Sequence, residues 1–223
     1  MKPWTVIGRT TTPDGTELTL TQHDSELVIA ANGQSLMSSR MHGSEEALAV
    51  LGCRHARTLP RPHVLVGGLG MGFTLRAALD VLPATACVTV AELVPAVVEW
   101  NRGPLAVVAA HPLDDPRVHV EEGDVAAVLR ANRGRFDAVL LDVDNGPAAF
   151  TASGNAGLYD AAGLAEARAS LTPGGVLAVW SAAEDQAFER RLRAAGFTVG
   201  RERVRGRGNK GPRHTIVVAQ RPA

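Results

Sequence analysis

Three segments of this chain carry residues that could hold a nucleoside, and they follow one another in a fixed order. The first is the glycine-rich run 67–72, where the backbone can approach a ligand closely. Glu92 follows about 20 residues later, and a carboxylate there can accept both hydroxyls of a ribose. Asp124 could accept a hydrogen bond from an adenine amino group, or cap a helix. The glycines expected to contact the ligand are Gly67, Gly68, Gly70 and Gly72.

Each segment also has a purely structural interpretation. A glycine-rich run fits a tight strand-to-helix connection, and Glu92 fits a solvated acid at a strand end. The order of the three features makes a nucleoside site the better interpretation. The order alone does not separate a nicotinamide cofactor from an adenosyl sulfonium.

Two further carboxylates, Asp142 and Asp144, follow an apolar segment and could take part in proton transfer. An amine that attacks the carbon beside a sulfonium must first lose its proton, and free alkyl amines have pKa values of about 10. A carboxylate at this position can accept that proton or orient the amine. The Asp-Val-Asp run could instead bind a metal, but no His or further carboxylate cluster accompanies it. We therefore predict no metal site.

All of these residues stand just after apolar segments that the pattern predicts as strands. Helices of about ten residues separate the segments, which indicates a parallel sheet covered on both faces. We predict an α/β fold with a doubly wound, mostly parallel, Rossmann-like methyltransferase sheet, in which ligands bind beyond the carboxyl ends of the strands. The predicted strands are His63–Val66, Cys87–Ala91, Val118–Val120, Phe136–Leu141 and Val176–Trp180, with Pro173-Gly174-Gly175 as a turn before the last.

The first 43 residues are predicted to form a small β-hairpin region that packs on the larger domain of residues 44–223. Asn32-Gly33 between two strand candidates is a strong hairpin signal, because both residues tolerate a positive φ. Ser44-Glu45-Glu46 is expected to begin a helix. The four strand candidates are Trp4–Arg9, Glu17–His23, Glu26–Ala31 and Gln34–Ser38.

Composition narrows the class of protein. The chain has 223 residues, 45% of them hydrophobic, with 23 basic and 23 acidic side chains, so disorder and general nucleic-acid binding are not expected. No apolar run approaches the roughly 20 residues that span a bilayer, and the N-terminus does not look like a secretory signal, so no membrane partner is expected. Two cysteines cannot form a disulfide framework, which favours a cytoplasmic location.

Positive charge is concentrated near the C-terminus. Residues 201–214 hold six Lys or Arg and one acid. We expect strands at Thr198–Val204 and Thr215–Ala219, joined by a long basic loop. This loop is either a solvated hairpin tip or a lid whose Arg207, Lys210 and Arg213 clamp a carboxylate or phosphate.

The stretch from His63 to Ala195 resembles the spermidine synthase family, whose core is a methyltransferase-type Rossmann sheet. The N-terminal hairpin, with Gln34 followed by Glu45, also resembles that family's small β domain. The matching motifs are Val66-Gly67-Gly68-Leu69-Gly70-Met71-Gly72-Phe73-Thr74-Leu75-Arg76, Glu92-Leu93-Val94-Pro95, Asp115-Pro116-Arg117-Val118, Gly123-Asp124, Phe136-Asp137-Ala138-Val139-Leu140-Leu141-Asp142, Gly146-Pro147-Ala148, Leu158-Tyr159 and Leu171-Thr172-Pro173-Gly174-Gly175-Val176.

This resemblance implies roles for individual residues. Glu92 would hold the ribose of S-adenosylmethionine, or of its decarboxylated form, as co-substrate, and Asp124 would hold the adenine amino group. Asp142 would lie beside the nucleophile. Gln34 and Glu45 would contact the substrate, and Tyr159 would line its pocket or merely pack at the start of a helix. A homodimer is also suggested by the resemblance.

The chain departs from the family pattern at several acidic positions. Met71 stands where the family carries an aspartate that meets the donor's amine, and residues 38–44 lack the family's tyrosine and acids. The leading hypothesis is transfer of an aminopropyl group to a small-molecule amine. The alternatives are a methyltransferase or related transferase or cyclase acting on a small anionic metabolite, and a nucleoside-binding regulatory module without chemistry.

Overall fold

The computed structural model describes residues 3–143, 156–207 and 210–223, which form two sheets. The N-terminal sheet is antiparallel, with its four strands in chain order. Its tight turns are built where Asp24 and Asn32 adopt a positive φ. The strands are β1 (Thr5–Thr11), β2 (Glu17–His23), β3 (Glu26–Ala31) and β4 (Gln34–Ser38).

The central sheet has seven strands in the order β10-β11-β9-β8-β5-β6-β7. Strands β5 to β9 are mutually parallel, whereas β11 is antiparallel to both of its neighbours. The strands are β5 (His63–Gly67), β6 (Cys87–Glu92), β7 (Val118–Glu122), β8 (Phe136–Leu141), β9 (Leu171–Ser181), β10 (Thr198–Arg207) and β11 (Lys210–Gln220). The chain order reverses between β5 and β8, which makes their carboxyl ends the topological switch point.

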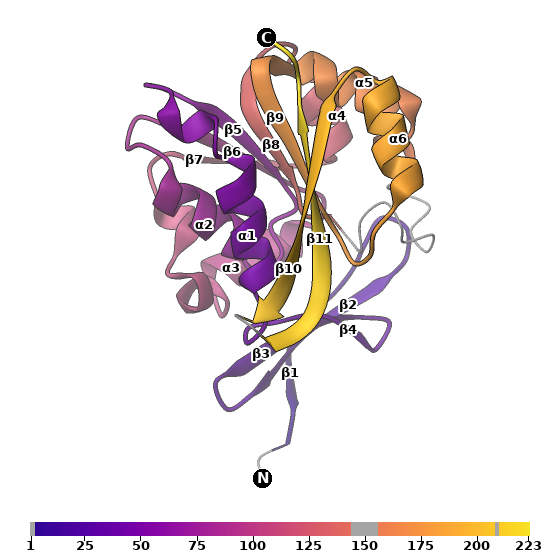
Figure 1. Cartoon of the computed structure of the whole chain (residues 1–223). Coiled ribbons are helices and arrows are strands. Elements are labelled where there is room, and N and C mark those ends of the chain that lie inside the picture. The colour runs from indigo at the N-terminus through magenta and orange to yellow at the C-terminus, as the bar shows by residue number, and fades with distance from the viewer. Residues whose placement is uncertain (1–2, 144–155, 208–209) are drawn as a thin grey trace.

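Helices cover both faces of the central sheet (Figure 1). One face carries α1 (Gly43–Gly52), α2 (Phe73–Val81) and α3 (Pro95–Arg102), and the other carries α4 (Val125–Ala131), α5 (Ala161–Ser170) and α6 (Gln186–Ala194). Short 3-10 turns occur at Ala56–Thr58, Ala106–Ala109, Pro112–Asp114 and Ala156–Leu158. Within the described ranges, every helix is too short or too polar to cross a membrane.

The apolar strands explain this layered arrangement. Val64, Leu65 and Val66 of β5 are fully buried, because side chains that alternate between the two faces meet helices on either side. Val64 and Val66 belong to the cluster under α1, α2 and α3, and Leu65 belongs to the cluster under α4, α5 and α6. The predicted α/β class, with its mostly parallel sheet and separate N-terminal β region, is confirmed.

Two local predictions were wrong. The basic segment is not a long loop, because β10 and β11 continue through most of it and Arg205 pairs directly with Arg213. Pro173-Gly174-Gly175 does not precede the strand but lies inside β9, which begins at Leu171, and the pairing of β8 with β9 is irregular there. In both strand pairs the register shifts at a bulge, so pairing continues across Gly and Pro residues that usually end a strand.

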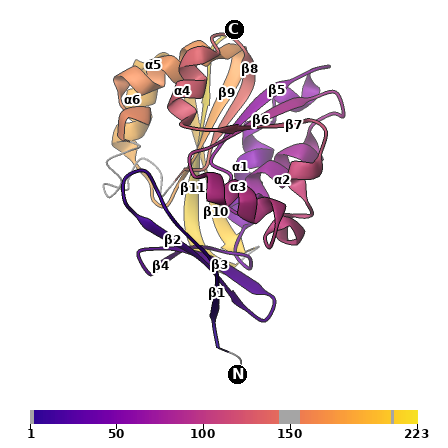
Figure 2. The ribbon, with the colours of Figure 1, turned by 180° about the vertical axis from the view of Figure 1, so that it is seen from behind.

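The N-terminal sheet lies at the end of the central sheet where the parallel strands finish (Figure 2). A Cβ on Gly70 would lie 3.2 Å from Sδ of Met37 in β4, and a Cβ on Gly8 in β1 would lie 2.6 Å from Nε1 of Trp100 in α3. The small sheet therefore borders the place where the functional residues were expected.

We expect the Gly52→Ala substitution to destabilise the fold by about 1–3 kcal/mol, because it overpacks the contact between α1 and the sheet. A Cβ at this position would lie 2.2 Å from Cδ2 of Leu140 and 2.8 Å from Cβ of Ala178. Urea denaturation measures the effect. The control is Gly200→Ala, where a Cβ meets nothing within 4 Å. Equal stabilities of the two variants would contradict this account of the packing.

Candidate active site

The glycine run turns at the switch point and touches the end of β8. The Asp142 N–H donates to the carbonyl oxygen of Gly67 at 2.9 Å. Gly68 has a φ of +88°, and a Cβ there would lie 2.4 Å from the carbonyl oxygen of Asp142. Only glycine meets both conditions, so Gly68 allows the two strand ends to approach each other.

The structure brings Asp142 together with Glu45 of α1 and Thr74 of α2. The Thr74 hydroxyl donates to Oδ2 of Asp142 at 2.6 Å. Burial and the negative charge of Glu45 raise the pKa of Asp142 to about 7, against the lowering effect of the Thr74 hydrogen bond. Burial also raises the pKa of Glu45, which accepts a 2.5 Å hydrogen bond from the Ser44 hydroxyl. A carboxylate with a pKa near 7 is suited to accept a proton at neutral pH.

Glu92 lies at the end of β6 and is 8% exposed. Its Oε2 accepts a hydrogen bond from the Leu69 N–H, and its Oε1 accepts one from the Val94 N–H, both at 2.9 Å. Burial raises the pKa of Glu92, and these backbone donors oppose that shift. Both carboxylate oxygens of Glu92 thus accept from the backbone next to the glycine run, which fixes the orientation of the carboxylate at the end of β6.

Asp124 caps a helix, which was one of the two interpretations of this residue. Its Oδ1 accepts a 2.9 Å hydrogen bond from the Ala126 N–H and caps α4. The residue is exposed, and capping uses one of its two carboxylate oxygens. The adenine interpretation stays open for the other oxygen.

The four glycines of the run lie together at the end of β5, but their structural roles differ. Gly67 ends β5, where a Cβ would lie 2.8 Å from Cγ2 of Val125. Gly70 and Gly72 have φ values of +52° and +84°. Met71, at the position of the family's aspartate, is 3% exposed and packs in the core, so it brings no charge to the loop.

The other residues predicted to bind substrate are more scattered. Gln34 is exposed at the start of β4. Tyr159 is buried and packs edge-on against Phe188 at 5.6 Å between ring centroids. Arg207 and Arg213 are exposed on the β10–β11 hairpin. Asp144 and the side chain of Lys210 lie outside the described part of the chain.

Sequence reasoning missed two residues that hold the site together. Thr74 was quoted only as part of a motif, although its hydroxyl holds Asp142. Asn101 of α3 was not singled out at all. It is 1% exposed, and its Nδ2 donates to the carbonyl oxygen of Gly70 at 2.8 Å. A polar residue predicted on the buried face of a helix was the available signal for Asn101.

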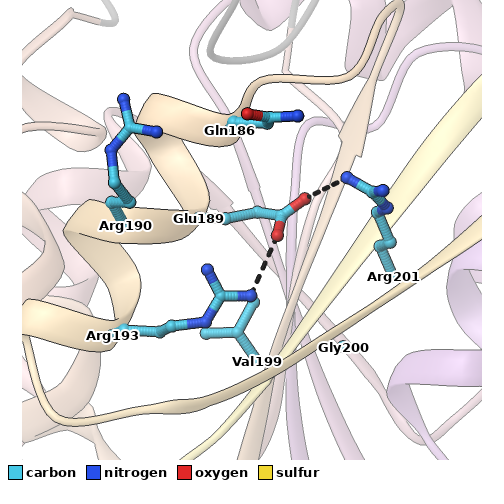
Figure 3. Close-up of a pocket in the computed structure, with 7 residues that line it drawn as sticks. All are labelled: Gln186, Glu189, Arg190, Arg193, Val199, Gly200 and Arg201. Atoms are coloured by element: carbon cyan, nitrogen blue, oxygen red, sulfur yellow. Dashed lines mark hydrogen bonds and ion pairs between the residues drawn. The ribbon is translucent and has the colours of Figure 1, made fainter.

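Two further features of the described residues bear on the chemistry. Among the described residues, no group of three His, Cys, Asp or Glu side chains could hold a metal ion. A separate pocket of about 420 Å³ lies between α6 and β10, where Arg193 and Arg201 donate to Glu189 at 3.0 and 2.9 Å (Figure 3). Burial acts to raise the pKa of Glu189, but the two guanidinium groups outweigh it and hold the pKa below its usual range. Glu189 is therefore a weaker base than Asp142.

Residues 95–218 match the family of S-adenosyl-L-methionine-dependent methyltransferases. The match includes more than half of the chain, so the chain belongs to this family. It is also 34% identical over 145 residues to the polyamine aminopropyltransferases of Mycobacterium tuberculosis (strain H37Rv) and Mycobacterium bovis. These matches cover 61% of this chain but only 27% of each relative, so the chain spans about a quarter of the length of these curated relatives.

Solved spermidine synthases share the fold. A spermidine synthase in complex with the transition-state analogue AdoDATO has a TM-score of 0.75 at 20% identity, covering 96% of this chain and 72% of that one. The spermidine synthase of Thermotoga maritima gives 0.73 at 20% identity, with the same coverage. A probable spermidine synthase from Corynebacterium glutamicum gives 0.67 at 15% identity, covering 97% and 80%. The resemblance to the spermidine synthase family is thus confirmed.

We expect the Asp142 carboxyl group to titrate near pH 7. Glu45→Gln should lower this midpoint, because it removes a negative charge, and Thr74→Val should raise it, because it removes a hydrogen bond to the carboxylate. Carboxyl carbon NMR titration measures the midpoint, with the resonance assigned by its loss in Asp142→Asn.

Asp80→Asn is the control for this titration. Asp80 is an exposed carboxylate that pairs with Arg76 on α2, so its removal should leave the Asp142 midpoint unchanged. A midpoint near the ordinary aspartate value of about 3.9, or shifts of the same sign in Glu45→Gln and Thr74→Val, would contradict the electrostatics described above.

Proposed function

We propose that this chain is a cytoplasmic transferase that moves an aminopropyl group from decarboxylated S-adenosylmethionine to a small-molecule amine. The observation that carries this proposal is Asp142, a carboxylate with a pKa of about 7 in contact with the glycine run at the switch point. The similarity to polyamine aminopropyltransferases and spermidine synthases supports it.

Asp142 acts in this reaction as the proton acceptor. It takes a proton from the acceptor's ammonium group, and the freed nitrogen lone pair attacks the carbon bonded to sulfur. The C–N bond forms as the C–S bond breaks, and the C–S electron pair stays on sulfur as a neutral thioether. Thr74 holds the Asp142 carboxylate in place, so that the reacting atoms can approach to about 3–3.5 Å.

The glycine run, Glu92 and Asp124 suit the nucleoside part of the donor. Glu92 would accept from the ribose hydroxyls, and its carboxylate is oriented by the backbone of the run itself. The absence of Cβ atoms in the run leaves room for close approach. Asp124 has an oxygen available for the adenine amino group.

The paired acids also favour the decarboxylated donor. Glu45 and Asp142 make the surroundings of the switch point negative, and a donor carboxylate beside them would be repelled. An ammonium group there is attracted instead, which compensates for the uncharged Met71. These charges favour aminopropyl transfer over methyl transfer. A homodimer, which the family resemblance suggests, belongs to the same proposal.

We expect purified protein to release 5′-methylthioadenosine from decarboxylated S-adenosylmethionine when a primary amine is present. Asp142→Asn should lower kcat by about 10²–10⁴-fold, because an amide cannot accept the proton. The rate should also fall as the pH drops through about 7, where Asp142 becomes protonated. Liquid chromatography of the thioether measures both effects.

The exposed Asp80→Asn variant serves again as the control and should keep the wild-type rate. The proposal fails if no amine yields the thioether. It also fails if intact S-adenosylmethionine is used and a methyl group is transferred, or if Asp142→Asn retains full activity.

A further inference from the structure

Strand β10 forms one edge of the central sheet and has an open side. Within the described ranges, β11 is the only strand that pairs with it. Thr198 and residues 200–203 are exposed. The N–H and C=O groups along the open side of an edge strand are a template for a further strand. The first half of β10 can therefore accept a strand from another chain.

Arginines occupy every second position of this strand. Arg201, Arg203 and Arg205 point to the side of the sheet that carries α4, α5 and α6. Val199, in the same alternation, packs with the core cluster on that side. Successive arginines of this row are about 6.8 Å apart, because a strand rises about 3.4 Å per residue. Arg205 lies directly opposite Arg213 of β11, and a cavity of about 210 Å³ opens beside Arg203 and Arg213.

A second cavity reaches the open side of β10. This cavity of about 420 Å³ lies between α6 and β10, and Val199, Gly200 and Arg201 all line it. Gly200 belongs to the opposite face of the strand, so the cavity extends to the edge backbone itself. Arg190 and Arg193 border it from α6 (Figure 3). Arginines of α6 therefore add to the positive charge of the row.

Two carboxylates offset only part of this charge. Glu189 forms ion pairs with Arg193 and Arg201. Glu184 forms ion pairs with Arg201 and Arg203. In the part of the chain that the structure describes, no ion pair is found for the remaining arginines, which are Arg190, Arg205 and Arg213.

A charged edge also has a protective interpretation, because charges on an edge strand keep it from pairing with apolar strands of other molecules. Such protection does not require Arg205 to face Arg213, since like charges that lie directly opposite each other destabilise a strand pair. A carboxylate beside these two arginines offsets their repulsion. The row of arginines therefore disfavours most strands and favours an acidic one.

The chemistry and spacing of the row favour an acidic peptide over a nucleic acid. Guanidinium groups bind carboxylates bidentately, and carboxylates on alternate residues of an added strand have the same spacing as the arginines. Single-stranded nucleic acids bind through aromatic stacking as well as charge, and among the described residues no Trp, Tyr or Phe lines either cavity. No segment of this sequence carries three acids at alternate positions, so the sequence does not itself supply a matching strand.

We propose that β10 is a docking strand for an extended acidic segment of a partner protein. The segment adds to the open side of β10 as a further strand, and carboxylates on its alternate residues face Arg201, Arg203 and Arg205. This inference does not rest on the proposed function, because Asp142 and Glu45 lie on the side of the sheet that carries α1 and α2.

The test uses two blocked hexapeptides, each made of three glutamates and three threonines. Calorimetry at low salt measures their affinities, because salt screens exposed charges. The peptide in which the two residues alternate should bind about tenfold more tightly than the peptide in which the three glutamates precede the threonines. Replacing two arginines of the row together, Arg203→Gln with Arg205→Gln, should weaken binding of the alternating peptide about tenfold.

The matched control replaces two arginines elsewhere, Arg54→Gln with Arg57→Gln. Both are exposed and follow α1, outside the row, and the net charge of the protein falls by the same amount. This variant should bind the alternating peptide as the wild type does. A loss equal to that of the Arg203 and Arg205 variant would show that net charge alone controls binding, and would overturn the proposal.

N-methylation of the peptide tests strand pairing separately from charge. Amides on alternate residues of a strand point to opposite edges, so two complementary methylated peptides each block one edge and keep all three carboxylates. At least one of them should bind about tenfold more weakly than the parent, because each lost backbone hydrogen bond weakens the pairing. The docking strand is disproved if neither unmethylated peptide binds, if both bind equally, or if both methylated peptides bind as tightly as the parent. It is also disproved if a six-nucleotide single-stranded DNA binds at least as tightly as the alternating peptide.

Discussion

The close contact between the ends of β5 and β8 is the constraint on which the candidate active site depends. Gly68 adopts a positive φ directly against the carbonyl oxygen of Asp142, and the Asp142 N–H binds the carbonyl oxygen of Gly67. Any side chain at position 68 would separate the two strands. This backbone contact fixes the distance between the glycine run and the Asp142 carboxylate, and the neighbouring elements are arranged around it.

The candidate active site keeps two acids, Glu45 and Asp142, where burial opposes their charge. Glu45 reaches Asp142 from α1, and the mutual repulsion contributes to the raised pKa of Asp142. Such an arrangement costs stability, and proteins usually retain it where the chemistry needs a base near neutral pH. Gly52 allows α1 to pack closely on β8 and β9. This packing keeps Glu45 near Asp142 despite the repulsion between the two carboxylates.

Acidic and basic residues lie on opposite faces of the central sheet. Glu45 and Asp142 lie on the side of α1 and α2. The register of β10 and β11 places Arg203, Arg205 and Arg213 on the side of α4, α5 and α6, because side chains alternate along a strand. The solved spermidine synthases share this fold, and Met71 is buried in the core of this chain.

The sequence by itself determined the alternation of strands and helices, the glycine run and the acids that follow β6, β7 and β8, because apolar periodicity and strand-end polarity are local properties of the chain. It did not reveal that Glu45 and Thr74 meet Asp142, that β10 and β11 continue through the basic segment, or that the Trp180 ring packs against His214. These contacts join residues far apart in the chain, and their existence depends on strand order, register and helix packing. Only the tertiary structure decided them, because strand pairing and close packing depend on residues from different segments of the chain and not on any one segment alone.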